Sequence, residues 1–153
     1  MQDQYMLIAI EQAKNALNND EVPVGAVIVD SITGVILARS ANKTEQSNDP
    51  TAHAEMNVIR DACNIKKSNR LIDCDLYVTL EPCPMCAHAI SAARIRRLYF
   101  GAYNPKGGGV EHGPRIYDFG SCNHKPQVYG GMCESICSKL LKGYFSGKRY
   151  KDY

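Results

Sequence analysis

The order of the apolar segments restricts this chain of 153 residues to an α/β fold. Two short apolar runs, 22–29 and 35–38, flank the turn-like residues 31–34 and predict a hairpin. Segments with helical spacing then alternate with further β-rich runs. Helices are predicted at 6–17, 52–63, 85–93 and 132–144, and the other strands at 76–80, 98–100 and 127–129. This order predicts a sandwich with a partly parallel central sheet, in a single domain over residues 1–153.

The composition excludes several classes of protein. Hydrophobic residues make up 44% of the chain and charged residues 22%, which is ordinary globular usage and argues against disorder or a fibrous protein. No run approaches the roughly 20 apolar residues that span a bilayer. The N-terminus also lacks the basic start and long apolar core of a secretory signal. We therefore expect a soluble, cytoplasmic protein with no membrane partner.

Charge is distributed unevenly along the chain. Residues 1–93 hold 7 Lys and Arg against 12 Asp and Glu, whereas residues 94–153 hold 11 against 4. The basic residues of the second half concentrate at 94–97 and 139–151. Such asymmetry favours a polyanionic partner. A solvated basic face that binds nothing is the alternative that charge alone leaves open.

Two of the seven cysteines have the spacing of metal ligands. Cys83 and Cys86 are three residues apart and lie on one face of the predicted helix. A Cys-x-x-Cys pair is typical of redox sites, of half a structural zinc site, or of a catalytic zinc site. With His53 as third ligand, the fourth position stays open for water, as in catalytic zinc sites. The other cysteines are interpreted as buried or incidental, with a second metal site at 122, 133 and 137 as the weaker alternative.

Glu55 is the candidate proton carrier beside this metal. Because positions i and i+2 of a regular helix point to different sides, His53 and Glu55 share a site only if they lie in the first turn. The helix-start signal Asp49-Pro50 just upstream favours that placement. His-x-Glu followed by Pro82-Cys83-x-x-Cys86 is the signature of zinc deaminases that act on bases.

Further stretches resemble the bacterial tRNA-specific adenosine deaminases. They are 22–29 (VPVGAVIV), 49–55 (DPTAHAE), 76–83 (LYVTLEPC), 94–95, 100–102 and 123–124. The resemblance covers nearly the whole chain and is densest over 22–105. It implies a cytidine-deaminase-like three-layer α/β/α sandwich with a mixed five-stranded sheet, and a homodimer with one Zn²⁺ per subunit. The implied reaction converts adenosine to inosine and ammonia at the wobble position of a tRNA anticodon, typically of arginine tRNA.

The resemblance also assigns roles to individual residues. His53, Cys83 and Cys86 match the zinc ligands, Glu55 matches the proton shuttle, and Asn42 matches the asparagine that hydrogen-bonds the target base. Contacts with the anticodon stem-loop are expected from Asn104, Asn123, His124, Tyr144, Phe145, Lys148 and Arg149. The last four fall where the family has an aromatic pair and basic residues near the RNA.

One loop departs from the family pattern, and the motif leaves other functions open. Tyr103 and Asn104 stand where relatives often carry a charged pair with Asp second, and 107–113 (GGGVEHG) also differs. This loop lies close to the nucleotide in the family, so RNA contacts are where this chain is expected to differ. The alternatives are a deaminase of free guanine, cytosine or cytidine, and a non-catalytic RNA-binding subunit. A structural zinc module explains neither Glu55 nor Asn42.

Overall fold

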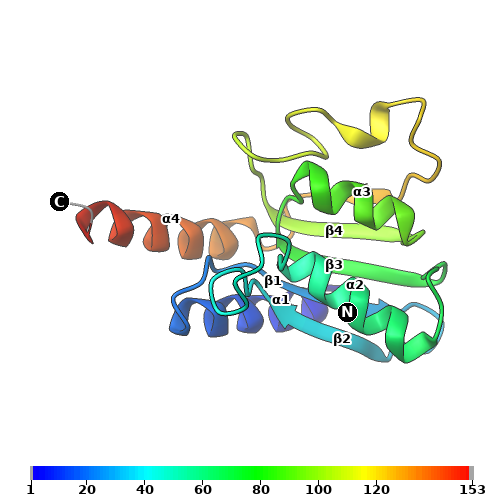
Figure 1. Cartoon of the computed structure of the whole chain (residues 1–153), viewed down its shortest axis with the longest axis horizontal. Helices are drawn as coiled ribbons and strands as arrows, with labels where there is room; N and C mark the ends of the chain where they lie inside the picture. The colour runs from blue at the N-terminus through cyan, green and yellow to red at the C-terminus, as the bar shows by residue number, and fades with distance from the viewer. Residues whose placement is uncertain (1, 152–153) are drawn as a thin grey trace.

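The computed structural model describes residues 2–151 and the side chains of residues 3–147. The helices are α1 (Gln2–Asn18), α2 (Ala54–Lys66), α3 (Pro84–Ala92) and α4 (Glu134–Lys151), with a 3-10 turn η1 (Ile116–Asp118). The strands are β1 (Gly25–Asp30), β2 (Ile36–Ala41), β3 (Cys74–Leu80), β4 (Arg97–Ala102) and β5 (Gln127–Tyr129) (Figure 1). Within residues 2–151 no helix is long and apolar enough to cross a membrane.

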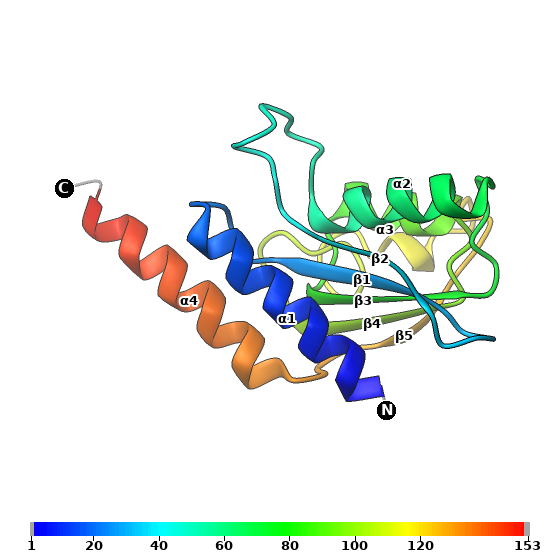
Figure 2. The same cartoon turned by 90° about the horizontal axis from the view of Figure 1, so that it is seen from below.

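The five strands form one mixed sheet in the order β2-β1-β3-β4-β5. β1 pairs antiparallel with β2 and β3, whereas β3, β4 and β5 run parallel. Figure 2 shows α2 and α3 on one face of the sheet and α1 and α4 on the other. The predicted three-layer α/β/α sandwich is therefore confirmed.

The central strands are apolar because helices cover both of their faces. Val27, Ile28, Leu76, Val78 and Phe100 are fully buried. Such two-sided burial explains why these strands read as nearly continuous apolar runs rather than alternating ones. Opposed positions on β3, β4 and β5 also carry tyrosines, whose rings stack in turn at centroid distances of 4.5 and 5.0 Å.

Several element boundaries differ from the prediction by a few residues, and two of these differences have clear local reasons. Residues 40 and 41, expected in a polar loop, extend β2, because Ser40 pairs with Ala26 and Ala41 pairs with Gly25 in buried positions. The last helix begins two residues late, at Glu134. Gly131 and Cys133 have left-handed backbones, with φ of 85° and 55°, which the helix cannot include.

The irregular segment 103–126 is ordered by packing against α3 (Figure 1). Ile116 and Tyr117, on η1, are buried, and the Tyr117 hydroxyl donates a 2.9 Å hydrogen bond to the Ala87 carbonyl. A long loop in a compact domain commonly has local order of this kind. Its first residues lie at the carboxyl end of β4, beside the starts of α2 and α3.

One edge of the sheet gathers the ends of several strands. The carboxyl ends of β3 and β4 meet there because the two strands are parallel. The antiparallel β1 begins at the same edge, and β2 ends there. The loops after strand carboxyl ends are the usual ligand sites of open α/β sheets. This edge carries every residue of the sequence signature.

Candidate active site

Two helix starts carry the metal-ligating side chains. His53 is the N-cap of α2 and Cys83 the N-cap of α3, both with extended backbones. N-cap positions usually hold a Ser, Thr, Asp or Asn whose side chain caps the helix. Neither His53 nor Cys83 makes a side-chain cap, so both side chains are free to point toward each other. The positive ends of both helix dipoles stabilise thiolates at this point.

The three side chains have the spacing of a tetrahedral zinc site. His53 Nδ1 lies 3.6 Å from Cys83 Sγ and 3.5 Å from Cys86 Sγ, and all three ligand atoms lie within 4.8 Å of one another. Zinc bonds of about 2.3 Å to sulfur and about 2.0 Å to nitrogen place tetrahedral ligand atoms about 3.5 Å apart. Two thiols and one imidazole also suit zinc chemically, so the donor set fits the ion.

The thiols are poised to lose protons to a metal. The hydrogen bond from Cys86, with that from His53, outweighs burial and lowers the pKa of Cys83 to about 4. The pKa of Cys86 is raised in turn, first by the proton it shares with Cys83 and then by burial. Because metal binds the deprotonated form of both thiols, its binding releases protons from this pair.

Glu55 reaches the same site because His53 stands outside the helix. The predicted start at residue 52 is wrong by two residues: the Asp49 carboxylate accepts hydrogen bonds from the Thr51 backbone and hydroxyl, forming a turn before α2. With His53 extended, Glu55 is the second residue of α2, and its side chain is only 4% exposed. Burial is the main cause that raises the pKa of Glu55. A carboxyl group that holds its proton more tightly suits proton transfer near neutral pH.

A cavity of about 200 Å³ lies over these residues. It is lined by Val22, Val24, Asn42, Thr44, His53, Ala54, Glu55, Leu80, Glu81, Cys83 and Asn104. Sites for drug-sized ligands are typically about 300–1,000 Å³, so this one has room for a single base. Asn42 is 6% exposed, and its side-chain amide donates a 3.3 Å hydrogen bond to the Thr44 hydroxyl.

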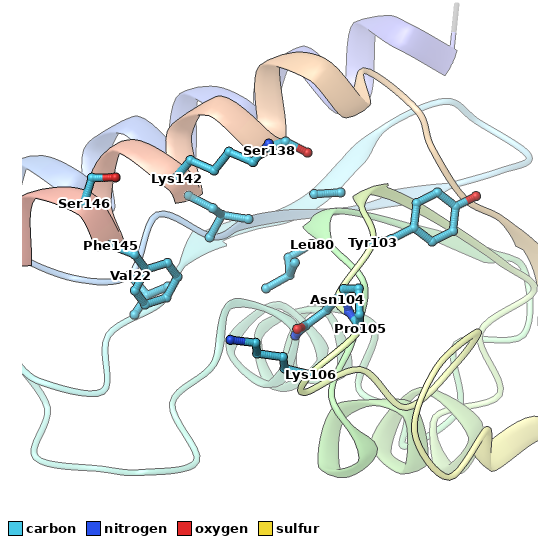
Figure 3. A pocket seen from close by; sticks show the side chains of 12 residues that line it. Val22, Leu80, Tyr103, Asn104, Pro105, Lys106, Ser138, Lys142, Phe145 and Ser146 are labelled. Carbon is cyan, nitrogen blue, oxygen red and sulfur yellow. The ribbon is translucent and has the colours of Figure 1, made fainter. Parts of the chain in front are cut away.

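A wider groove of about 820 Å³ continues from the cavity and shares Val22, Leu80 and Asn104 with it. Figure 3 shows side chains from α4 on one side of this groove and the loop after β4 on the other. Phe145 on α4 is 49% exposed and lines the groove together with Val22, across from Lys106 (Figure 3). The groove thus offers the aromatic surface of Phe145 next to the base-sized cavity. Lys106 and Lys142 add two cations to its lining.

Buried Glu81 is the main site residue that the sequence reading missed. Glu81 is 1% exposed and lines the cavity. Its carboxylate accepts hydrogen bonds from the loop that follows β4. Burial alone raises its pKa, but the hydrogen bonds from Asn104, His112 and Glu111 outweigh burial and lower it. The sequence indicated only a strand end at Glu81-Pro82. A glutamate directly before a metal-ligating Pro-Cys pair was the available signal.

The predicted RNA contacts are dispersed over the molecule. Asn104 lines both cavities, and Phe145 lines the groove, whereas Tyr144 lines a separate hollow beside the end of α1. Asn123 and His124 lie near the far end of α3, where His124 Nε2 is 2.6 Å from the Ile95 carbonyl oxygen. The side chains of Lys148 and Arg149 lie outside the described residues.

Comparison with known sequences identifies relatives of this site. The sequence pattern of the cytidine and deoxycytidylate deaminase zinc-binding region matches residues 1–102. The chain is 52% identical over 148 residues to the tRNA-specific adenosine deaminase of Agrobacterium fabrum, covering 97% of this chain and 96% of that protein. It is 43% identical over 147 residues to the protein of the same name from Bacillus subtilis, covering 96% and 90%.

Solved structures give a consistent result. A chain from work on A-to-I editing by tRNA:A34 deaminases at the wobble position superposes with a TM-score of 0.88 at 53% identity. That superposition covers 90% of this chain and 99% of the other. A guanine deaminase from Bacillus subtilis superposes with a TM-score of 0.63 at 42% identity, covering 65% of this chain and 63% of that one.

Proposed function

This chain belongs to the cytidine and deoxycytidylate deaminase zinc-binding family, and we propose that it deaminates adenosine to inosine at the wobble position of a tRNA anticodon. It is a hydrolase that releases ammonia. The observation that carries the proposal is a single base-sized cavity whose wall includes two of the three metal-ligating residues, the buried Glu55 and Asn42. The near full-length identity to tRNA-specific adenosine deaminases supports the choice of substrate.

The side chains divide the chemistry between them. When bound to His53, Cys83 and Cys86, zinc supplies the Lewis acid that lowers the pKa of a water to about 7. With the metal in place, Glu55 would take a proton from the attacking water and deliver it to N1 of adenine as the water oxygen adds to C6. Glu55 then moves the proton of the new C6 hydroxyl to the amino group, the C6–N6 bond breaks, and the oxygen stays on C6 as the carbonyl of inosine. Adenosine and water thus give inosine and ammonia.

The cavity walls orient the base for this attack. Asn42 is held by its own backbone, whose N–H donates to the Val24 carbonyl, and by the bond to Thr44. A fixed amide that hydrogen-bonds the base keeps C6 facing the water, which lowers the entropic part of the barrier. Val24 and Leu80 supply apolar surface on which the base packs.

The groove supports a base that is part of a polynucleotide. A base reaching the cavity leaves its neighbours over the groove, where Phe145 offers a stacking surface and Lys106 and Lys142 offer cations for phosphates. Anticodon-loop bases are displaced from their stack at modest cost. We propose that Lys148 and Arg149 extend the same basic surface. Replacing both with Gln is expected to weaken tRNA binding and to flatten its dependence on salt.

The decisive experiment is a substrate comparison with the purified, zinc-loaded protein. Arginine tRNA with adenosine at the wobble position is incubated beside free adenosine, cytidine and guanine. We expect inosine in the tRNA alone, and none with the Glu55→Ala protein. Turnover of a free base or nucleoside without turnover of tRNA would contradict this proposal and make the chain a deaminase of that free substrate.

A guanine deaminase is the second candidate, and a specific observation favours it. The Bacillus subtilis guanine deaminase shares 42% identity over the part of the chain that superposes. The open groove next to the cavity argues the other way, because a free base needs no surface for neighbouring nucleotides. Including guanine in the assay separates the two.

We also propose one zinc ion per subunit, a homodimer of single-domain subunits, and a cytoplasmic location. The three-ligand cluster supports one ion per chain, and the tRNA substrate supports the location. Zinc analysis of a weighed sample and sedimentation equilibrium test the stoichiometry and the dimer. A metal content near two per chain, or a monomer at micromolar concentration, would contradict these assignments.

A further inference from the structure

We propose that Glu81 is a positioning residue that fixes the loop 104–112 to the start of α3, so that the groove stays aligned with the cavity. The inference rests on the proposed function, because it concerns how neighbouring nucleotides are held while the target base reacts. Glu81 is distinct from Glu55: its carboxylate is occupied by the loop and takes no part in the proton transfers described above.

The carboxylate accepts five hydrogen bonds from this one loop. Oε1 accepts from the Asn104 N–H at 3.0 Å and lies 2.8 Å from His112 Nδ1. Oε2 accepts from the N–H groups of Val110, Glu111 and His112 at 3.2, 2.9 and 3.0 Å. Three successive N–H groups on one oxygen form an anion-binding arrangement, here filled by the protein's own side chain.

The loop backbone approaches Glu81 too closely for an ordinary side chain. A Cβ at Gly108 would lie 2.4 Å from Glu81 Oε2 and 2.6 Å from the Asn104 carbonyl oxygen. A Cβ at Gly109 would lie 2.6 Å from the backbone nitrogen of Pro84, the first residue of α3. The loop is thus seated against both the carboxylate and the helix that carries Cys86.

The two residues that this attachment joins, Asn104 of the loop and Glu81, both line the substrate cavity. Asn104, at the first hydrogen bond, lines the cavity and the groove, and Lys106 beside it lines the groove. Glu81 itself is separated from Cys83 by one proline. Releasing the loop would therefore move the groove wall relative to the zinc site while leaving the ligands in place.

Glu81→Gln tests this directly, because an amide cannot replace a carboxylate here. Either orientation of the amide points its NH₂ at a backbone N–H, at Asn104 or at 110–112, so buried donors lose their acceptor. We expect KM for an anticodon stem-loop to rise roughly 10- to 100-fold, with kcat within about threefold and zinc content unchanged. Hydrogen exchange at amides 104 and 110–112 should accelerate. Glu81→Asp, which keeps both oxygens, should recover part of the loss.

Glu111→Gln is the matched control. It makes the same change of charge in the loop that Glu81 holds, but its side chain is exposed and makes no bond to Glu81 in the described structure. We expect KM within about twofold of wild type. His112→Ala removes one of the five bonds from a partly exposed side chain, and should raise KM roughly three- to tenfold without threatening folding.

The outcomes separate this inference from the proposed function. If the wild-type protein does not deaminate tRNA, the proposed function fails, and hydrogen exchange alone still tests the attachment of the loop. If it does, but Glu81→Gln and His112→Ala match Glu111→Gln in KM and exchange, the positioning role is wrong. Loss of zinc in Glu81→Gln, or a fall in kcat at constant KM, would instead assign Glu81 to support of the metal helix.

Discussion

The metal centre and the groove share a wall at Val22, Leu80 and Asn104, yet they are built differently. The metal centre takes its side chains from two helix starts that pack on the same sheet edge, and Cys86 and Glu55 within it are buried. The groove lies between α4 and an irregular loop, and its aromatic residue Phe145 is half exposed.

This difference separates chemistry from selection. Fixed, buried groups hold a proton and a metal at set distances, which proton transfer requires. Exposed side chains around an open groove can follow the uneven surface of a folded RNA. Substitutions at the centre should therefore abolish turnover, and substitutions in the groove should alter only how substrate is held. Each prediction below tests one side of that division.

The largest effect is expected from removing a ligand at the metal centre. Cys83→Ser replaces a soft thiolate by a hydroxyl that is a poor zinc ligand at neutral pH. We expect most of the zinc to be lost, and deamination to fall to background, which atomic absorption and an inosine assay measure together. Cys63→Ser, on α2 and outside the cluster, is the control and should keep both. Normal zinc content in Cys83→Ser would break the ligand assignment.

The next effect isolates chemistry from metal binding. Glu55→Gln keeps the shape of the side chain but cannot carry a proton, so kcat should fall roughly 10²- to 10⁴-fold. Zinc content and stem-loop affinity should match wild type, as measured by metal analysis and fluorescence anisotropy. Turnover near the wild-type rate would remove Glu55 from the mechanism.

The same division explains what the sequence could predict. The ligands and Glu55 belong to short motifs at helix starts, where spacing along the chain nearly equals arrangement in space. The groove joins Val22 to Phe145, residues more than a hundred positions apart, and no periodicity relates them. Tyr144 and Phe145 illustrate the limit: they are adjacent in sequence, but a helix turns them toward different hollows.

The succession of strands and helices along the chain was predictable because buried strands and helices leave strong patterns, whereas the three-layer arrangement with five strands came from the family resemblance. Boundaries at residues 40–41 and 52–53 were not, because they depend on pairing with β1 and on a turn closed by Asp49. The positioning role that we propose for Glu81 could not be predicted from the sequence for a related reason. Its partners are backbone N–H groups more than twenty residues away, which have no signature in the sequence.

A smaller effect is expected from the groove. Phe145→Ala removes the exposed aromatic surface, and base–aromatic stacking contributes about 1–3 kcal/mol per base. We expect KM for the stem-loop to rise roughly tenfold with kcat within about twofold. Ile136→Ala, a similarly exposed residue of α4 outside the groove, serves as the control. A fall in kcat equal to the rise in KM would show that the groove also orients the reacting base.

The smallest effect concerns the part of segment 103–126 that lies beyond the loop attached to Glu81. Tyr117→Phe deletes the hydrogen bond to the Ala87 carbonyl, which costs about 1 kcal/mol of unfolding free energy and about 2–4 °C in Tm. Tyr5→Phe removes a comparable but exposed bond to the Gly34 carbonyl and should cost less. Calorimetry measures both. Because Tyr117 holds η1 to α3 rather than to the groove, KM should not change. A severalfold rise in KM would mean that the whole segment, and not only its first ten residues, positions the substrate.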